Sequence, residues 1–269
     1  MTVALGLVCA DGVVVASDSQ GTSENLTAAQ AIKVQRVAGL PAVWTASGTV
    51  YCIEEVQQET NQWASNHTYK KAIEGGDLNG IRSAVGDGVR GALGRAYETA
   101  LPMGLQQVQP GGAHVFHTSF LFLGWANNQP WFLEVDGSGQ LNWHTGQRFK
   151  AVGSGGAFAD VAGAVMFHLI EGEDLSLDLG LQVAYRAIET TCEVSSGLVG
   201  GRVQLGMVNS EGARILTEEE VTKVQDEVTG WKQMERELLR GALAAAPVEQ
   251  PPTIEEIEEE SSPVEAGDV

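Results

Sequence analysis

The order of its strand-forming and helix-forming segments is the feature that most constrains the fold of this chain. Short apolar runs rich in β-branched residues come in two blocks of four, and each block is followed by two segments with helical spacing. Because strands and helices come in blocks rather than in strict alternation, the sequence favours antiparallel sheets with helices segregated outside them. We therefore expect an α+β fold, a four-layer αββα sandwich of two antiparallel sheets flanked by helices.

Local patterns predict the individual elements. Asp11-Gly12 between two valine-rich runs is a strong hairpin signal. The strands are expected over residues 2–9, 13–17, 31–37, 42–46, 118–124, 130–135, 140–144, 149–152 and 203–208. The helices are expected over residues 49–66, 78–101, 156–170, 176–192 and 217–243. The last helix begins with Thr217-Glu218-Glu219-Glu220, which is typical of a capping box.

The composition divides the chain into a globular part and an acidic tail. Of the 269 residues, 43% are hydrophobic, which is enough for a sizeable core. We expect one domain over residues 1–246. Residues 247–269 hold eight acidic residues and no lysine or arginine, so this segment is expected to be a disordered tail. The net charge of −19 argues against nucleic acid and anionic membranes as partners.

The remaining composition indicates a cytoplasmic protein that needs no metal or other cofactor. The three cysteines are far apart and form no CxxC pair, which is typical of core thiols in a reducing compartment. The five histidines are scattered and show no metal-ligand spacing. The run from Val3 to Val8 is too short and lacks the basic flank of a signal peptide. No apolar run approaches membrane-span length.

Thr2 is the first candidate for chemistry. It follows Met1 directly, and removal of Met1 is usual when a small residue follows. Thr2 would then present a hydroxyl and a free α-amine within one residue, a pair that can act as nucleophile and base. The alternative is that Thr2 simply starts an edge strand.

Four further positions could support such a nucleophile. The hairpin places Asp18 at the same end of the sheet as Thr2, although Asp18 could also be an ordinary turn residue. Lys33 lies in the apolar run Ala31-Ile32-Lys33-Val34, so it needs a partner or a lowered pKa if it is buried, whereas a surface lysine needs neither. Gly48, where a strand changes to a helix, could offer an oxyanion-stabilising amide or only a tight turn. The loop Gly153-Ser154-Gly155-Gly156 has the same character as the turn at Gly48, since it also leads from a strand into a helix. It lacks a Walker lysine, so it is weak evidence for phosphate binding.

Taken together, these positions resemble the proteasome family of N-terminal threonine hydrolases, its β-type catalytic subunits and the related bacterial self-compartmentalising proteases. The resemblance covers most of the chain from Thr2 to about Leu239. The opening Thr-Val-Ala-Leu-Gly-Leu-Val-Cys-Ala-Asp-Gly-Val-Val-Val-Ala-Ser-Asp is close to the hairpin at the start of the family. Phe120-Leu121-Phe122-Leu123-Gly124-Trp125 resembles the strand that opens its second sheet.

The resemblance implies the N-terminal nucleophile hydrolase fold and a role for each site residue. Thr2 would be the nucleophile, Lys33 the active-site lysine, Asp18 its counter-charge and Gly48 the oxyanion donor. Ser154, Glu193 and Ser196 would hold the α-amine; Glu193 departs from the family, which usually has aspartate there. The residues implied to bind substrate are Gly21, Thr22, Ala31, Gln35, Ala46, Val50 and Glu54.

The function that this resemblance implies is a threonine-type endopeptidase of a homo-oligomeric ring. Its substrate would be a peptide or an unfolded protein, and no particular ATPase or regulator is implied. Two alternatives are a small-molecule amidase of the N-terminal nucleophile group, which would share Thr2, and a structural ring subunit with weak or no catalysis.

Overall fold

The structure is a computed structural model that describes residues 2–22, 28–100, 107–108, 114–144, 146, 148–169, 175–195 and 199–245. The described residues fall into two compact units, one up to Val228 and one from Thr229 onward. Both large sheets and five of the helices belong to the first unit. The acidic segment 247–269 lies outside the described residues, so the expected boundary at residue 246 stays a prediction.

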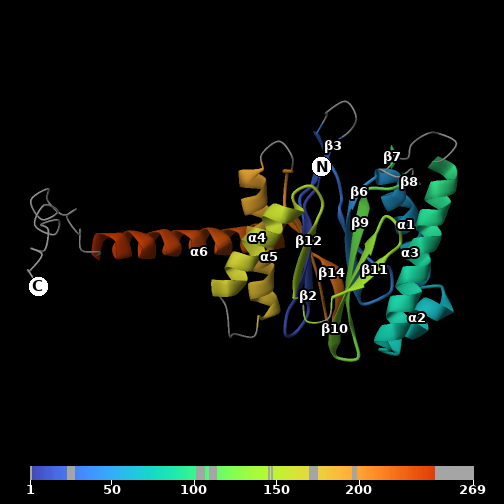
Figure 1. Cartoon of the computed structure of the whole chain (residues 1–269). Coiled ribbons are helices and arrows are strands. Elements are labelled where there is room, and N and C mark those ends of the chain that lie inside the picture. The colour runs from blue at the N-terminus through green and yellow to red at the C-terminus, as the bar shows by residue number, and fades with distance from the viewer. Residues whose placement is uncertain are drawn as a thin grey trace, which may run out of the picture. The chain divides into compact units, whose positions relative to one another are not determined.

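Two five-stranded antiparallel sheets form the middle of the first unit (Figure 1). The strand order of the first sheet is β12 (Phe149–Val152), β1 (Ala4–Val8), β2 (Val13–Ser17), β13 (Gln204–Asn209) and β14 (Gly212–Ile215). The strand order of the second sheet is β11 (Leu141–Trp143), β10 (Gln129–Asp136), β9 (Thr118–Ala126), β6 (Ala42–Gly48) and β5 (Val34–Arg36). Two-stranded pairs join β3 (Gln20–Thr22) to β4 (Ala28–Gln30) and β7 (Gln107–Val108) to β8 (His114–Val115).

Helices cover the outer face of each sheet, so the expected four-layer αββα sandwich is confirmed. The second sheet is covered by α1 (Val50–Trp63) and α3 (Leu78–Ala100), and α2 (His67–Glu74) packs on α3. The first sheet is covered by α4 (Gly156–Leu169) and α5 (Leu177–Val194). The last helix is α6 (Glu218–Ala245).

Strand β9 is buried on both faces and shows how the layers pack. Phe120 and Phe122 belong to the core beneath α1 and α3, where Phe122 stacks on Trp44 with ring centroids 5.8 Å apart. Leu121 and Leu123 alternate with them and belong to the core between the two sheets. Side chains alternate along a strand, so one apolar run supplies both cores.

The two sheets lie close together around Gly6 in β1. A Cβ atom at this position would lie 2.7 Å from Cζ of Phe132 and 2.9 Å from Cδ1 of Leu123, both on the second sheet. These distances leave no room for a side chain, so the glycine permits the observed spacing of the sheets.

Several local expectations are confirmed. The hairpin at Asp11-Gly12 joins β1 to β2 with Ala4 opposite Ser17. The capping box is reciprocal, since the Glu220 amide donates to Thr217 Oγ1 at 3.3 Å and the Thr217 amide donates to Glu220 Oε2 at 2.7 Å.

Other expectations were wrong or incomplete. The strand expected over residues 31–37 is limited to Val34–Arg36, because the backbone before Val34 bonds to a side chain instead of a strand. Helix α2 and strand β14 were not predicted. Strand β14 is a short strand at the edge of the first sheet, and its last two residues, Arg214 and Ile215, are exposed. It therefore lacks the apolar run from which the other strands were predicted.

Candidate active site

The register of the first hairpin brings the start of the chain against Asp18. Ala4 pairs with Ser17, so Val3 and Asp18 meet one position further along. The Val3 amide donates to Asp18 Oδ1 at 3.0 Å, and the Asp18 amide donates to the Val3 carbonyl at 3.1 Å. Ser17 Oγ also donates to the Val3 carbonyl, at 2.8 Å. The residue next to Thr2 is thus fixed by side-chain and backbone bonds from the end of β2.

Asp18 forms a buried ion pair with Lys33. The Lys33 Nζ lies 2.7 Å from Asp18 Oδ1, and the exposed fractions of the two side chains are 9% and 0%. The Gly200 amide donates to the other carboxylate oxygen at 3.2 Å. Three donors, including the Val3 amide, therefore converge on one buried carboxylate, which satisfies the requirement that a buried charge be paired and hydrogen-bonded.

Burial lowers the pKa of the Lys33 ammonium below its ordinary value of 10.5. The hydrogen bond and the charge of Asp18 act in the opposite direction, and so does the nearby Cys192, but desolvation is the largest effect. Lys33 is thus a buried, paired lysine, and the alternative of an exposed surface lysine is wrong.

The loop after β12 holds the backbone of Thr2. The Thr2 nitrogen donates to Ser154 Oγ at 3.1 Å, and the Gly155 amide donates to the Thr2 carbonyl at 3.2 Å. This nitrogen becomes the α-amine once Met1 is removed. Gly153 adopts a φ of +94°, and a Cβ there would lie 2.3 Å from the Thr2 carbonyl oxygen. Only glycine fits at this position, both for its backbone conformation and for its contact with Thr2.

Replacing Gly153 with alanine should therefore displace Thr2. We expect labelling of Thr2 by a threonine-directed electrophile to slow by about 10-fold to 100-fold, because small displacements of a reacting group cost rate steeply. Intact-mass measurement over time gives the labelling rate.

Gly146→Ala is the matched control. Its φ of +86° imposes nearly the same backbone strain, but an added Cβ meets no described atom within 4 Å. If both variants are slowed by the same factor relative to the wild type, backbone strain and not contact with Thr2 accounts for the effect.

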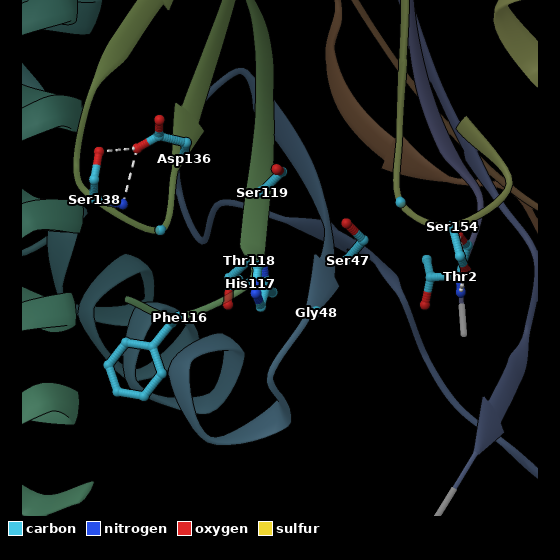
Figure 2. A pocket seen from close by; sticks show the side chains of 12 residues that line it. Thr2, Ser47, Gly48, Phe116, His117, Thr118, Ser119, Asp136, Ser138 and Ser154 are labelled. Atoms are coloured by element: carbon cyan, nitrogen blue, oxygen red, sulfur yellow. Dashed lines mark hydrogen bonds between the residues drawn. The ribbon is translucent and has the colours of Figure 1, made fainter. Parts of the chain in front are cut away.

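Thr2 opens onto a cleft of about 680 Å³ between the ends of the two sheets. Figure 2 shows Thr2 and Ser154 on one side and Asp136 and Ser138 on the other, with Ser47 and Gly48 between them. The cleft is lined by Thr2, Ser47, Gly48, Phe116, His117, Thr118, Ser119, Asp136, Gly137, Ser138, Gly153 and Ser154. The nucleophile candidate, the serine beside its nitrogen and the glycine expected to stabilise an oxyanion thus share one cleft.

Strand register explains the wall opposite Thr2. Ser47 pairs with Ser119, and Ser119 pairs with Asp136, so these three residues form a row across β6, β9 and β10. Gly48, one position further along, has a φ of +115° and pairs with Thr118. A Cβ at Gly48 would lie 1.9 Å from the His117 carbonyl oxygen, so the backbone turns here at a position that only glycine allows.

None of the residues expected to bind substrate is among the described residues that line this cleft. Ala46 is buried in β6, while Val50 and Glu54 are exposed on α1. Gly21 and Thr22 end β3, Gln35 is half-buried in β5, and the side chain of Thr22 lies outside the described residues. Ala31 lines a second cavity of about 1030 Å³. Their role in substrate binding stays a prediction.

The two residues expected to complete the support of the α-amine remain unassigned. Glu193 is exposed in the last turn of α5 and is not among the residues that line the described cleft. Ser196 lies outside the described residues. Their roles stay predictions as well.

Sequence reasoning missed three groups of functional candidates. The far wall of the cleft comes from residues 116–119, at the start of an expected strand, and from Asp136–Ser138, which the sequence presents as an ordinary turn. Gly200 donates to Asp18, and Gln204 bonds to the backbone of Ala31, Lys33 and Val34. A lone glutamine at the start of an apolar strand was the one available signal for the last of these.

The described residues contain neither a cluster of metal ligands nor a helix suited to cross a membrane. No group of three or more His, Cys, Asp and Glu side chains in the described ranges could hold a metal ion. Within the same part of the chain, no helix is both long enough and apolar enough to cross a membrane.

Comparison with known proteins identifies the fold. No model of a protein family and no curated protein sequence matches this chain. A solved structure of the Anbu (Gly-1) mutant from Hyphomicrobium sp. strain MC1 is similar to it, with a TM-score of 0.63 and 17% sequence identity. The match covers 94% of this chain and 100% of that one. At this identity the likeness shows the fold alone.

Proposed function

We propose that this chain is a threonine-type endopeptidase of a self-compartmentalising, proteasome-like ring, with Thr2 as its nucleophile after Met1 is removed. One observation carries the proposal. Thr2 faces a cleft with its nitrogen on Ser154, and the neighbouring residue is bonded to a buried Lys33–Asp18 pair. The proteasome-like fold supports the same conclusion.

In the proposed mechanism, Thr2 Oγ attacks a peptide carbonyl. The freed α-amine, with an ordinary pKa of about 8, accepts the hydroxyl proton through a water molecule and later gives it to the leaving amine. Ser154 Oγ, 3.1 Å from this nitrogen, orients the amine for that transfer. A second water then hydrolyses the acyl-enzyme ester and regenerates Thr2.

The Lys33 ammonium supplies the positive charge that favours the alkoxide of Thr2. Asp18 keeps the ammonium in position and compensates for its burial. A cation held away from bulk water acts more strongly on a nearby developing charge than an exposed one would.

The amide of Gly48 is the proposed oxyanion donor. Gly48 lines the cleft beside Ser47, on the sheet opposite Thr2, and its backbone conformation is fixed by close approach to His117 and Thr118. A donor fixed before the reaction costs no reorganisation when the tetrahedral intermediate forms.

The proposed substrate is a peptide or an unfolded protein chain. The cleft opens at the surface and extends from Thr2 to Asp136–Ser138, so groups on either side of a scissile bond have space to bind. A small-molecule amidase would hydrolyse compact amides and leave peptide reporters intact, which separates that alternative.

Assembly into a homo-oligomeric ring in the cytoplasm completes the proposal. Helix α4 leaves Phe158, Val161 and Val165 exposed by 46%, 66% and 58% on positions i, i+3 and i+7, which lie on one face of a helix. An exposed apolar stripe of this kind is typical of a surface that packs on another chain.

Intact-mass measurement after treatment with a threonine-directed covalent inhibitor tests the proposal. We expect a chain that lacks Met1 and carries one adduct, mapped to Thr2 by fragmentation. Native mass measurement of the same sample should give a multiple of the 28.5 kDa chain. A chain that keeps Met1 and takes no adduct would defeat the peptidase proposal, and a monomer would defeat the ring.

A further inference from the structure

We propose that Gln204 is the positioning residue for Lys33: its side-chain amide holds the segment that carries the lysine and so sets the distance from Lys33 to Asp18. As a role in catalysis, this inference rests on the proposed function. Its geometric content can be tested without any enzymatic activity.

The segment before β5 is held by a side chain where a strand partner would be expected. Gln204 Oε1 accepts from the Lys33 amide at 2.8 Å and from the Val34 amide at 3.2 Å. Gln204 Nε2 donates to the Ala31 carbonyl. One side chain therefore bonds to three backbone groups that surround Lys33.

Only a glutamine-type side chain in one orientation satisfies these three partners. Two backbone donors face one end of the amide and one backbone acceptor faces the other, so the bonds themselves decide which end is oxygen and which is nitrogen. Glutamate would lose the donor to Ala31, and asparagine, shorter by one methylene, would not reach all three groups.

The place of Gln204 in the fold links the two members of the ion pair. Gln204 starts β13 and pairs with Ser17, the residue directly before Asp18, in the first sheet. Lys33 directly precedes β5, which belongs to the second sheet. Gln204 therefore fixes a segment of the second sheet to the part of the first sheet that carries Asp18, where the ion pair measures 2.7 Å.

Gln204 and Thr2 face different spaces. Gln204 lines the second cavity, beside Ala31 and Cys192, whereas Thr2 lines the cleft. A substitution at Gln204 therefore leaves the described walls of the substrate cleft unchanged, and it should affect the chemical step more than substrate binding.

The test compares Gln204→Met, which keeps the side-chain length and removes all three bonds, with the shorter Gln204→Asn. Gln182→Met is the matched control, because Gln182 bonds to Glu227 at the surface. The first readout is the reactivity of each lysine toward acetic anhydride as a function of pH, measured by mass spectrometry. This readout needs no substrate, and the exposed Lys70 in the same sample is the internal reference.

In the wild type, the titratable groups of the described residues that act on the charge of Lys33 include Asp18 from the end of β2 and Cys192 from α5. Once Gln204 no longer holds the segment, Lys33 should move toward water, so its labelling midpoint should rise toward 10.5 while that of Lys70 stays constant. The second readout is peptide cleavage, for which we expect kcat to fall about 10-fold to 100-fold with KM within about twofold.

An unchanged Lys33 midpoint in both Gln204 variants would overturn the inference, whatever their activity. A shifted midpoint in a protein that cleaves no peptide, even as wild type, would support the positioning role and contradict the proposed function instead. A shift of equal size in Gln182→Met would also overturn the inference.

Discussion

Thr2→Ala is expected to lower kcat/KM for peptide cleavage by at least about 10³-fold, because it removes the proposed nucleophile and leaves the rest of the site intact. The fold should be unaffected. In the described part of the chain, the hydrogen bonds of Thr2 to Ser154 and Gly155 use only its backbone nitrogen and carbonyl. Cleavage of a fluorogenic peptide and thermal unfolding measure the two effects separately.

Thr2→Ser is the matched control for this substitution. Serine keeps the hydroxyl, and both serine and alanine are small enough to permit removal of Met1. We expect the serine variant to keep measurable activity and to form the covalent adduct, whereas the alanine variant does neither. Residual cleavage in Thr2→Ala at the level of the serine variant would show that another residue is the nucleophile.

Asp18→Asn is expected to lower the free energy of unfolding by about 3–5 kcal/mol, because it leaves the buried Lys33 ammonium without its counter-charge. Asparagine has almost the same shape as aspartate, so the loss does not come from a cavity. Chemical denaturation at pH 7 measures the change.

The pH dependence identifies the cause of this loss. The folded-state pKa of Lys33 is already lowered by burial, and removal of Asp18 lowers it further. Between that pKa and 10.5 the unfolded chain binds more protons than the folded one, so stability rises with pH. The difference between variant and wild type should therefore shrink as the pH is raised toward 10.5.

Asp87→Asn provides the comparison on the surface. Asp87 pairs with Arg90 at 2.6 Å, but both side chains are largely exposed, so the loss should stay within about 1 kcal/mol. If Asp18→Asn lowers the free energy of unfolding no more than Asp87→Asn does, the buried ion pair does not stabilise the fold around Thr2.

The contact between Lys33 and Asp18 could be anticipated from local sequence patterns. Lys33 is a charge inside an apolar run, and the Asp11-Gly12 turn specifies which strand returns beside the first. Burial then makes a counter-charge necessary, so the pairing with Asp18 follows from physical chemistry once the strands adjoin. The strand expected over residues 118–124 formed as β9, and its continuous apolar run is typical of a strand buried on both faces.

The cleft wall and the bonds of Gln204 could not be predicted because they depend on register between distant strands. Ser47, Ser119 and Asp136 become neighbours only through the pairings of β6, β9 and β10, and a slip of one residue would turn each to the opposite face. Gln204 lies 171 residues from the Lys33 amide that it binds. No local composition encodes contacts over such separations.

The close approach of the two sheets at Gly6 has a consequence for the proposed chemistry at Thr2, just before the start of β1. Thr2 lies just before β1 of the first sheet and Gly48 ends β6 of the second, so in the proposed mechanism the distance between the attacking oxygen and the oxyanion donor depends on the spacing of the two sheets. The side chains of Leu123 and Phe132 pack against Gly6 and so set the distance between the two sheets at this point. In the proposed reaction, core residues that never meet a substrate would therefore set the geometry at Thr2, and substitutions among them would change turnover.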